Sequence, residues 1–332
     1  MLKFVIDSAI PYISGVLEPY GVVVYLPGKD FTPADVRDAD ALIIRTRTRC
    51  DASLLEGSRV RLIATATIGF DHIDMEWCNA HNIKVITAAG CNAAGVLQWV
   101  SAALAMLSEN GGLLSDKTTL GIVGVGNVGS LVERYARAWG FRVLRCDPPR
   151  QQREGGDFLP LEQVLQQSDI VTLHTPLDAT TYHMINHETL SLMRSNAVLI
   201  NASRGEVAAT DALLATDRPL FIDVWENEPN IDEKLLHKAV VATPHIAGYS
   251  AQGKANATAM VMAAVAEEFS LPLVGWYPEN VSRVERQNIE WQRMCDSIKL
   301  RCDLRKITND LRQNPNDFEL LRNEYHYREE YF

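Results

Sequence analysis

Short apolar runs recur along the first 90 residues, separated by polar stretches long enough to form helices. The runs lie at residues 4–6, 22–25, 41–44, 62–64 and 84–86. Runs of this length and spacing are typical of βαβ units, in which parallel strands build one sheet. The pattern therefore predicts a parallel α/β domain over about residues 1–93.

A second alternation of strands and helices follows the mostly apolar stretch 96–107, which predicts a buried helix. The predicted strands lie at residues 119–123, 141–147, 170–174, 197–201, 220–224 and 240–242. A complete dinucleotide-binding sheet has six strands. We therefore expect a second doubly wound domain over about residues 94–249.

Glycines follow the apolar run at 119–123. Gly124, Gly126 and Gly129 match the pattern GxGxxG. In nucleotide-binding folds the first glycine makes the turn, the second lets the backbone approach a pyrophosphate, and the third lets the helix pack on the strand. Apolar residues at helical spacing follow, so free N–H groups at the start of a helix would face the phosphates. The alternative is a glycine-rich turn that binds no nucleotide.

Asp147 ends the strand predicted after the glycine turn, about 20 residues beyond it, where such folds hold the ribose. Its negative charge would repel a 2′-phosphate, which favours NAD over NADP. Arg145 and Arg150 lie near it in sequence and weaken this preference. The expected cofactor is therefore NAD.

Polar residues end each of the last four predicted strands, at 174–176, 201–205, 223–229 and 243–249. The carboxyl ends of parallel strands meet at one sheet edge, so Arg204, Glu228 and His245 should converge there. Oxidation of an alcohol beside a carboxylate needs a base, a cation and a hydride acceptor. His245 could be the base, Glu228 could orient it, and Arg204 could bind the carboxylate. A structural role for each is the alternative.

Three alternate arginines, Arg45, Arg47 and Arg49, follow the run at 41–44. If the strand continues, all three point the same way, which favours an anion that would neutralise them. An ordinary solvated strand end is the alternative for Arg47 and Arg49. Arg45, nearest the strand, is the better candidate for binding.

The net charge of −10 argues against general affinity for nucleic acid or for an anionic membrane. The six cysteines form no CxxC pair and no metal-type spacing with histidine, which favours reduced thiols and no metal site. The N-terminus is typical of a strand rather than a signal peptide, and no apolar run approaches the ~20 residues of a membrane span. We expect a soluble, cytoplasmic protein.

Together these motifs resemble the D-isomer-specific 2-hydroxyacid dehydrogenase family. The matching stretches are 124–129, 203–205, 223–229 and 244–246. The resemblance implies two Rossmann-like doubly wound parallel-sheet domains and a catalytic triad of Arg204, Glu228 and His245. It further implies a flavodoxin-like substrate domain of residues 1–93 with 250–270, an inserted NAD domain of residues 94–249, and a short α+β dimerisation region over residues 271–332.

Further stretches, at 65–67, 90–93, 146–149, 245–249 and 253–254, are similar to a branch of this family that oxidises a small phosphorylated 2-hydroxy acid. The resemblance implies a homodimer and substrate contacts from Thr46, Thr67 and Tyr249, to which Arg45 is added. The expected cofactor-binding residues are Gly124, Gly126, Asn127, Val128, Gly129, Asp147, Thr175, Ala202, Asp223 and Gly248.

The chain departs from the family pattern at Gln98, where glutamate is usual, and at Ala209, where aspartate is usual. Its C-terminal region is also shorter than usual, but the triad is untouched. Two alternatives remain. One is a related dehydrogenase of the phosphoglycerate or the glyoxylate/hydroxypyruvate type, and the other is a non-catalytic NAD-sensing protein similar to corepressors built on this fold.

Overall fold

The computed structural model describes residues 1–109 and 113–332, and the chain divides into two compact units. The first unit consists of residues 1–92 and 251–283, and the second of residues 93–250 and 284–332. These boundaries differ by one residue from those expected near residues 93 and 250. Residues 271–332 form no unit of their own, because the first part of this region joins the first unit and the rest joins the second.

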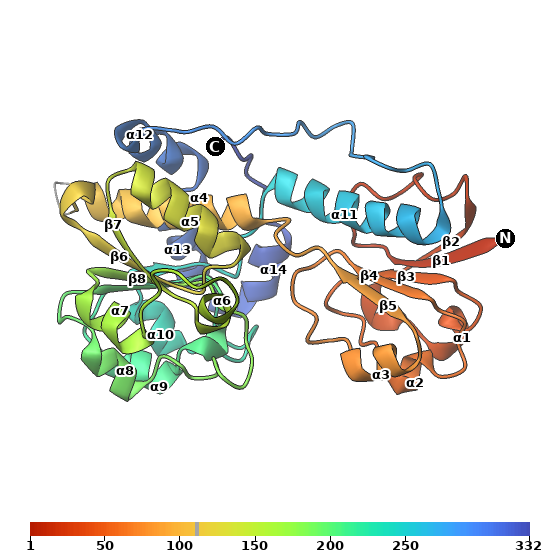
Figure 1. The fold of residues 1–332 in the computed structure, drawn as a ribbon, viewed down its shortest axis with the longest axis horizontal. Helices are drawn as coiled ribbons and strands as arrows, with labels where there is room; N and C mark the ends of the chain where they lie inside the picture. Colours follow the sequence, from red (N-terminus) through yellow and green to blue (C-terminus); the bar gives the residue numbers. More distant parts are fainter. Residues whose placement is uncertain (110–112) are drawn as a thin grey trace. The chain divides into compact units, whose positions relative to one another are not determined.

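The first unit contains one parallel sheet of five strands in the order β2-β1-β3-β4-β5 (Figure 1). This is the flavodoxin-like order that was expected. Each strand covers one of the predicted apolar runs. They are β1 (Leu2–Asp7), β2 (Gly21–Leu26), β3 (Ala41–Ile44), β4 (Leu62–Thr65) and β5 (Lys84–Thr87).

Helices cover both faces of this sheet. Successive residues of a strand point to opposite faces, so Phe4 and Ile6 of β1 pack toward α11, whereas Val5 packs with Leu54 of α2. The helices are α1 (Pro33–Val36), α2 (Ala52–Leu55), α3 (Met75–Ala80) and α11 (Ala251–Phe269), with the short 3-10 helix η1 (Gly28–Asp30).

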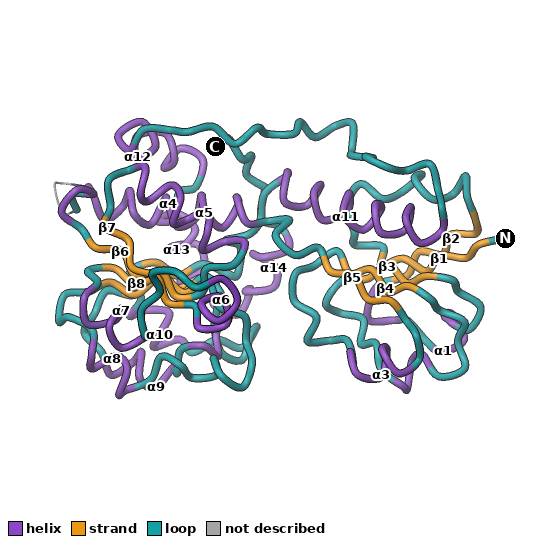
Figure 2. Tube along the Cα trace, in the orientation of Figure 1, coloured by secondary structure: helices purple, strands orange, loops and turns teal. Residues whose placement is uncertain are grey.

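The second unit contains one parallel sheet of six strands in the order β7-β6-β8-β9-β10-β11 (Figure 2). The chain leaves β6 for β7 and then returns to β8 on the other side of β6, which creates a switch point at their carboxyl ends. All six predicted strands are confirmed. They are β6 (Thr119–Val123), β7 (Arg142–Cys146), β8 (Ile170–Leu173), β9 (Val198–Asn201), β10 (Leu220–Ile222) and β11 (Val241–Ala242).

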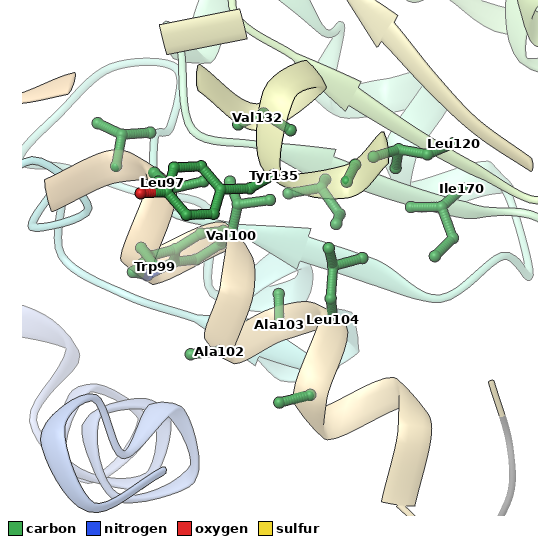
Figure 3. Packing of buried hydrophobic residues seen from close by; sticks show 14 of the residues in the cluster. Leu97, Trp99, Val100, Ala102, Ala103, Leu104, Leu120, Val132, Tyr135 and Ile170 are labelled. Atoms are coloured by element: carbon green, nitrogen blue, oxygen red, sulfur yellow. The ribbon is translucent and has the colours of Figure 1, made fainter. Parts of the chain in front are cut away.

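Two layers of helices enclose the second sheet. On one face, α4 (Ala93–Ser108) packs against α5 (Asn127–Ala138) and α12 (Trp291–Arg301). Figure 3 shows Leu97 and Val100 of α4 beside Tyr135 of α5. The other described helices of this unit are α6 (Pro148–Glu154), α7 (Leu161–Gln167), α8 (His187–Leu192), α9 (Thr210–Ala215), α10 (Glu233–Lys238), α13 (Leu304–Gln313), α14 (Phe318–Asn323), η3 (Ser115–Lys117), η4 (Gly205–Val207) and η5 (Pro315–Asp317).

The regular elements within residues 284–332 are helices, which corrects the expected mixture of strands and helices. All of them are described, and their one β contact is an isolated bridge between Arg328 and Ser250. Met294 of α12 joins the core beside α4, whereas Leu311 of α13 and Phe318 of α14 join the core on the other face. These apolar contacts place the segment on the second unit.

Among residues 1–109 and 113–332, the structure contains no helix with both the length and the apolar character needed to span a membrane.

Candidate active site

The glycine turn begins directly after β6 and leads into α5, whose first residues are Asn127 and Val128. Gly124 has φ +85°, and a Cβ there would lie 2.8 Å from the backbone nitrogen of Thr175. A Cβ on Gly129 would lie 2.0 Å from the carbonyl oxygen of Gly124. At Gly126, in contrast, a Cβ would meet nothing within 4 Å. Two glycines thus permit tight packing, and the third faces open space, as close approach of a pyrophosphate requires.

Asp147 follows β7 and holds this turn. Its Oδ1 accepts a hydrogen bond from the backbone of Arg150 at 2.9 Å, which caps α6, and its Oδ2 accepts from the backbone of Val125 at 2.7 Å. The Arg150 side chain donates to the Val125 carbonyl at 2.5 Å and to Ser130 Oγ at 2.8 Å. A carboxylate has about four acceptor positions, so ribose hydroxyls could still bind Asp147.

Thr175 follows β8 beside the same turn. Its hydroxyl oxygen is buried and has no hydrogen-bond partner among the described residues. Buried hydroxyls are ordinarily paired, so this one fits a group supplied by a bound cofactor. The neighbouring His174 bonds Thr172 Oγ1 through Nε2 at 3.0 Å, and burial lowers the pKa of His174 to about 3. His174 is therefore neutral and adds no charge to the site.

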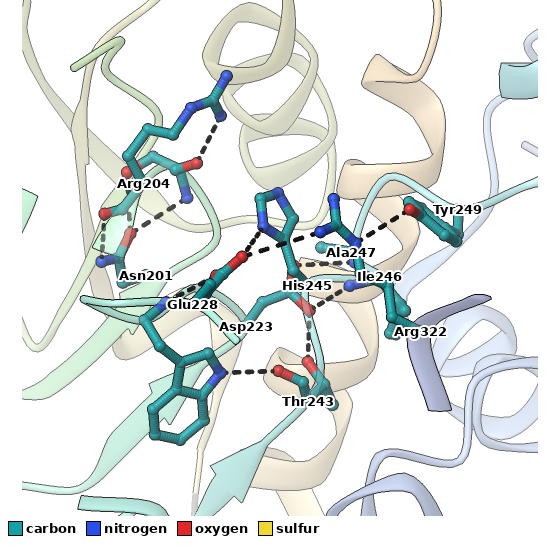
Figure 4. A network of polar contacts seen from close by, with 12 residues as sticks. Asn201, Arg204, Asp223, Glu228, Thr243, His245, Ile246, Ala247, Tyr249 and Arg322 are labelled. Atoms are coloured by element: carbon teal, nitrogen blue, oxygen red, sulfur yellow. Dashed lines mark hydrogen bonds and ion pairs between the residues drawn. The ribbon is translucent and has the colours of Figure 1, made fainter. Parts of the chain in front are cut away.

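His245 and Glu228 form a hydrogen-bonded pair, as their positions after β11 and β10 predicted. Nδ1 of His245 donates to Oε2 of Glu228 at 2.7 Å, while Oε1 of Glu228 accepts from the backbone of Trp225 at 3.0 Å (Figure 4). Burial raises the pKa of Glu228, but the hydrogen bond and charge of His245 outweigh it and leave this pKa below its usual range. An ionised Glu228 fixes the proton on Nδ1 and leaves Nε2 as the basic nitrogen.

Asp223 fixes the backbone that carries His245. Its Oδ1 accepts from the backbone of Ile246 at 2.8 Å and from Thr243 Oγ1 at 2.5 Å, and its Oδ2 accepts from the backbone of Ala247 at 2.9 Å. His245 has φ +55°, a conformation that costs energy for a non-glycine residue and is here enforced by these bonds. The expected NAD contact Asp223 is only 1% exposed, so its carboxylate organises the loop from within. Burial raises the pKa of Asp223.

Arg204 lies in the loop after β9, which also contains the expected cofactor residue Ala202. Its Nη1 donates to the carbonyl of Ser203 at 2.8 Å, and its own carbonyl accepts from Asn201 Nδ2 at 3.0 Å. A Cβ on the next residue, Gly205, would lie 2.0 Å from the backbone carbon of Trp225, which packs this loop on the loop of Glu228. Figure 4 shows the side chains of Arg204 and His245 extending to the same side.

Tyr249 and Gly248 follow His245, and an arginine absent from the predicted site lies beside them. Nε of Arg322 donates to the Tyr249 hydroxyl at 3.0 Å, and Nη1 of Arg322 lies 4.0 Å from Oε2 of Glu228. Arg322 is far from both partners in sequence, and no local motif marks it.

The other expected substrate residues, Arg45, Thr46 and Thr67, lie in the first unit. Strand β3 ends at Ile44 and residues 46–48 form a turn, so the strand does not continue and the condition for three arginines on one face is not met. Thr48 Oγ1 donates to the Gly28 carbonyl at 2.8 Å, which attaches this turn to η1. Thr67 Oγ1 lies 2.6 Å from Thr65 Oγ1 in the loop after β4.

Arg45 and Arg49 have different surroundings. Nη1 of Arg45 donates to the carbonyl of Ala9, in the loop after β1, at 3.2 Å. Nε of Arg49 donates to Asp51 at 2.6 Å, with 84% of the Arg49 side chain exposed. Arg45 therefore lies at the switch point of its sheet, whereas Arg49 forms a surface ion pair.

Comparison with known proteins gives one family. Residues 97–247 match the model of the NAD binding domain of the D-isomer specific 2-hydroxyacid dehydrogenases. An erythronate-4-phosphate dehydrogenase of Bacteroides fragilis is 49% identical over 281 residues, 81% of each chain. One of Porphyromonas gingivalis is 44% identical over 281 residues, 81% of this chain and 76% of the relative.

Solved structures agree on the fold. The TT0316 protein of Thermus thermophilus superposes with a TM-score of 0.68 at 26% identity, covering 81% of this chain and 97% of that one. The NAD+-bound 3-phosphoglycerate dehydrogenase of Entamoeba histolytica gives a TM-score of 0.69 at 23% identity, covering 85% and 99%, and supports the fold alone. By its sequence relatives, the chain belongs to the family of erythronate-4-phosphate dehydrogenases, NAD-dependent oxidoreductases among the D-isomer-specific 2-hydroxyacid dehydrogenases.

Proposed function

We propose that this chain oxidises 4-phospho-D-erythronate at C2 to 2-oxo-3-hydroxy-4-phosphobutanoate and so serves the synthesis of pyridoxal 5′-phosphate. The names of its relatives support this substrate. The observation that carries the chemistry is the 2.7 Å bond between His245 and Glu228. It lies beyond the carboxyl ends of β10 and β11, strands of the sheet whose β6 leads into the glycine turn.

His245 acts as the general base. The C2 hydroxyl of the substrate gives its proton to Nε2, because Nδ1 already donates to Glu228. The resulting imidazolium is stabilised by the neighbouring carboxylate. General bases placed in this way contribute about 10²–10⁴-fold to a rate.

Arg204 binds the carboxylate at C1 and polarises the oxygen at C2 as it becomes an oxo group. A guanidinium offers a planar fork of donors that matches a carboxylate. One of its nitrogens is engaged by the Ser203 carbonyl at 2.8 Å, which fixes the side chain and leaves the others for substrate.

The cofactor is held by the glycine turn, Asp147, Thr175 and the loops containing Ala202 and Gly248. Bound NAD supplies the acceptor for the hydride that leaves C2. The open space at Gly126 and the unpaired hydroxyl of Thr175 support this placement.

Mixing the purified protein with NAD and 4-phospho-D-erythronate tests the function through the absorbance of NADH. We expect turnover with this acid and at least about tenfold lower kcat/KM with 3-phosphoglycerate, glycerate and D-lactate. A preference for 3-phosphoglycerate or glycerate would assign the chain to a sister activity. NADH binding with no oxidation of any of these acids would favour a sensor.

We further propose that the chain works as a homodimer, as the resemblance of its sequence implies, and in the cytoplasm, which its cysteine pattern favours. Sedimentation equilibrium should then give about twice the mass of one 37.0 kDa chain. A mass equal to one chain would contradict the dimer.

A further inference from the structure

Arg322 connects two side chains of the proposed site. Its Nε donates to the hydroxyl of Tyr249 at 3.0 Å, and its Nη1 lies 4.0 Å from Oε2 of Glu228, the oxygen that also accepts from His245. Figure 4 shows its guanidinium between the imidazole of His245 and the ring of Tyr249. One cation thus contacts both the carboxylate that orients the base and a residue expected to bind substrate.

The segment that carries Arg322 is fixed to the same loop at further points. Arg328, only 4% exposed, donates to the carbonyls of Ala247 and Ile246, the latter at 3.2 Å, and to that of Gly95 at 2.8 Å. Glu330 accepts from Ser250 Oγ at 2.6 Å. The C-terminal segment therefore holds the loop that follows His245 at several places.

We propose that Arg322 is a positioning residue for hydride transfer, orienting the Tyr249 hydroxyl toward the substrate and holding Glu228 against His245. This inference rests on the proposed function. Because Tyr249 accepts from Arg322 through its oxygen, this bond fixes the position of the phenol oxygen without using the phenol proton. The C-terminal segment then contributes to chemistry in each chain, whether or not it also joins two chains.

The charge of Arg322 adds to this role. Glu228 accepts from both His245 and the Trp225 backbone, and a second cation 4.0 Å away favours its ionised form. Arg322 keeps 27% of its side chain exposed, so it is reachable from solvent and is not merely a core contact. A positioning role predicts an effect on turnover without an equal effect on stability or NADH binding.

Replacing Arg322 by methionine keeps the length of the side chain and removes its charge and donors. We expect Arg322→Met to lower kcat/KM at least about tenfold for the hydroxy acid that the wild type oxidises best, with the Kd for NADH within about twofold. Arg322→Lys should recover part of the loss. The matched control is Arg305→Met in the same segment, whose ion pair with Glu109 is exposed, and it should leave kcat/KM unchanged.

A double-mutant cycle with Tyr249→Phe separates positioning from a structural role. If Arg322 acts through Tyr249, Arg322→Met should cost clearly less in the Tyr249→Phe background than in the wild type. Full additivity, unchanged kcat/KM in Arg322→Met, or a loss matched by weaker NADH binding and a lower Tm would overturn the proposal. Oxidation of a different acid by the wild type would overturn only the assigned substrate. Failure to oxidise any 2-hydroxy acid would overturn both proposals.

Discussion

The two sheets share one strand order over five positions, β2-β1-β3-β4-β5 in the first unit and β7-β6-β8-β9-β10 in the second. Their first turns differ. After β6, Gly126 faces open space at the start of α5. After β1, the buried carboxylate of Asp7 accepts from the backbone of Ala9 at 2.9 Å, and a Cβ on Gly28 would lie 2.5 Å from its other oxygen.

This difference shows that the topology of the sheet sets where a ligand can bind, whereas the side chains there set which ligand binds. In both sheets the switch point lies beyond the carboxyl ends of the first and third strands, where ligands of such folds bind. In the first unit the carboxylate of Asp7 occupies this position, and its negative charge disfavours a pyrophosphate. Arg45, at the end of β3, donates to the Ala9 carbonyl in the same turn. Only the second unit has the glycines that a dinucleotide needs, so we expect NAD there and a simpler anion near Arg45.

The largest effect should come from His245, the proposed base, which lies in the second unit. His245→Ala is expected to lower kcat about 10²–10⁴-fold, because no other group replaces Nε2 as proton acceptor. The Kd for NADH should remain within about twofold, since the glycine turn is untouched. Fluorescence titration with NADH alongside steady-state rates measures both, and a loss confined to NADH affinity would show that His245 is not the base.

The glycines of the second unit offer a smaller effect with an internal control. Gly126→Ala should fold normally and weaken NADH binding about tenfold, because its methyl group enters the space that we assign to the pyrophosphate. Gly129→Ala should instead lower Tm, because its methyl group meets the Gly124 carbonyl at 2.0 Å. Equal NADH affinity in Gly126→Ala and the wild type would contradict the placement of the cofactor.

The sequence predicted the elements of both sheets because their strands are short apolar runs with regular spacing. It also predicted that Glu228 and His245 would meet, since both follow strands that end at one edge. It could not predict Arg322, which reaches the site through packing of the C-terminal helices on the second unit. Contacts of this kind depend on the packing of apolar residues such as Leu311 and Phe318, which are far in sequence from Glu228 and Tyr249. No local sequence pattern predicts them.

The hydrogen bonding of Gln98 could not be predicted from the sequence either, because it depends on residues packed around it from distant parts of the chain. Gln98 lies in the stretch 96–107 that was predicted as a buried helix, and it is 0% exposed. Neither its amide nitrogen nor its amide oxygen has a hydrogen-bond partner among the described residues. The resemblance to the family marked this position as unusual, but the lack of partners follows only from the three-dimensional surroundings of α4.

The last comparison lies in the first unit, where Arg49→Ala should give the smallest effect and Arg45→Ala a larger one. Arg45→Ala should raise KM about tenfold for 4-phospho-D-erythronate and less for D-erythronate without its phosphate, because a charge-assisted bond to phosphate is lost. Arg49→Ala removes an exposed ion pair with Asp51 and should change KM less than about twofold. Steady-state rates with both acids give the comparison. An equal rise in KM for the two acids would assign Arg45 a structural role through its bond to the Ala9 carbonyl, and the first unit would then need another group to select the phosphate.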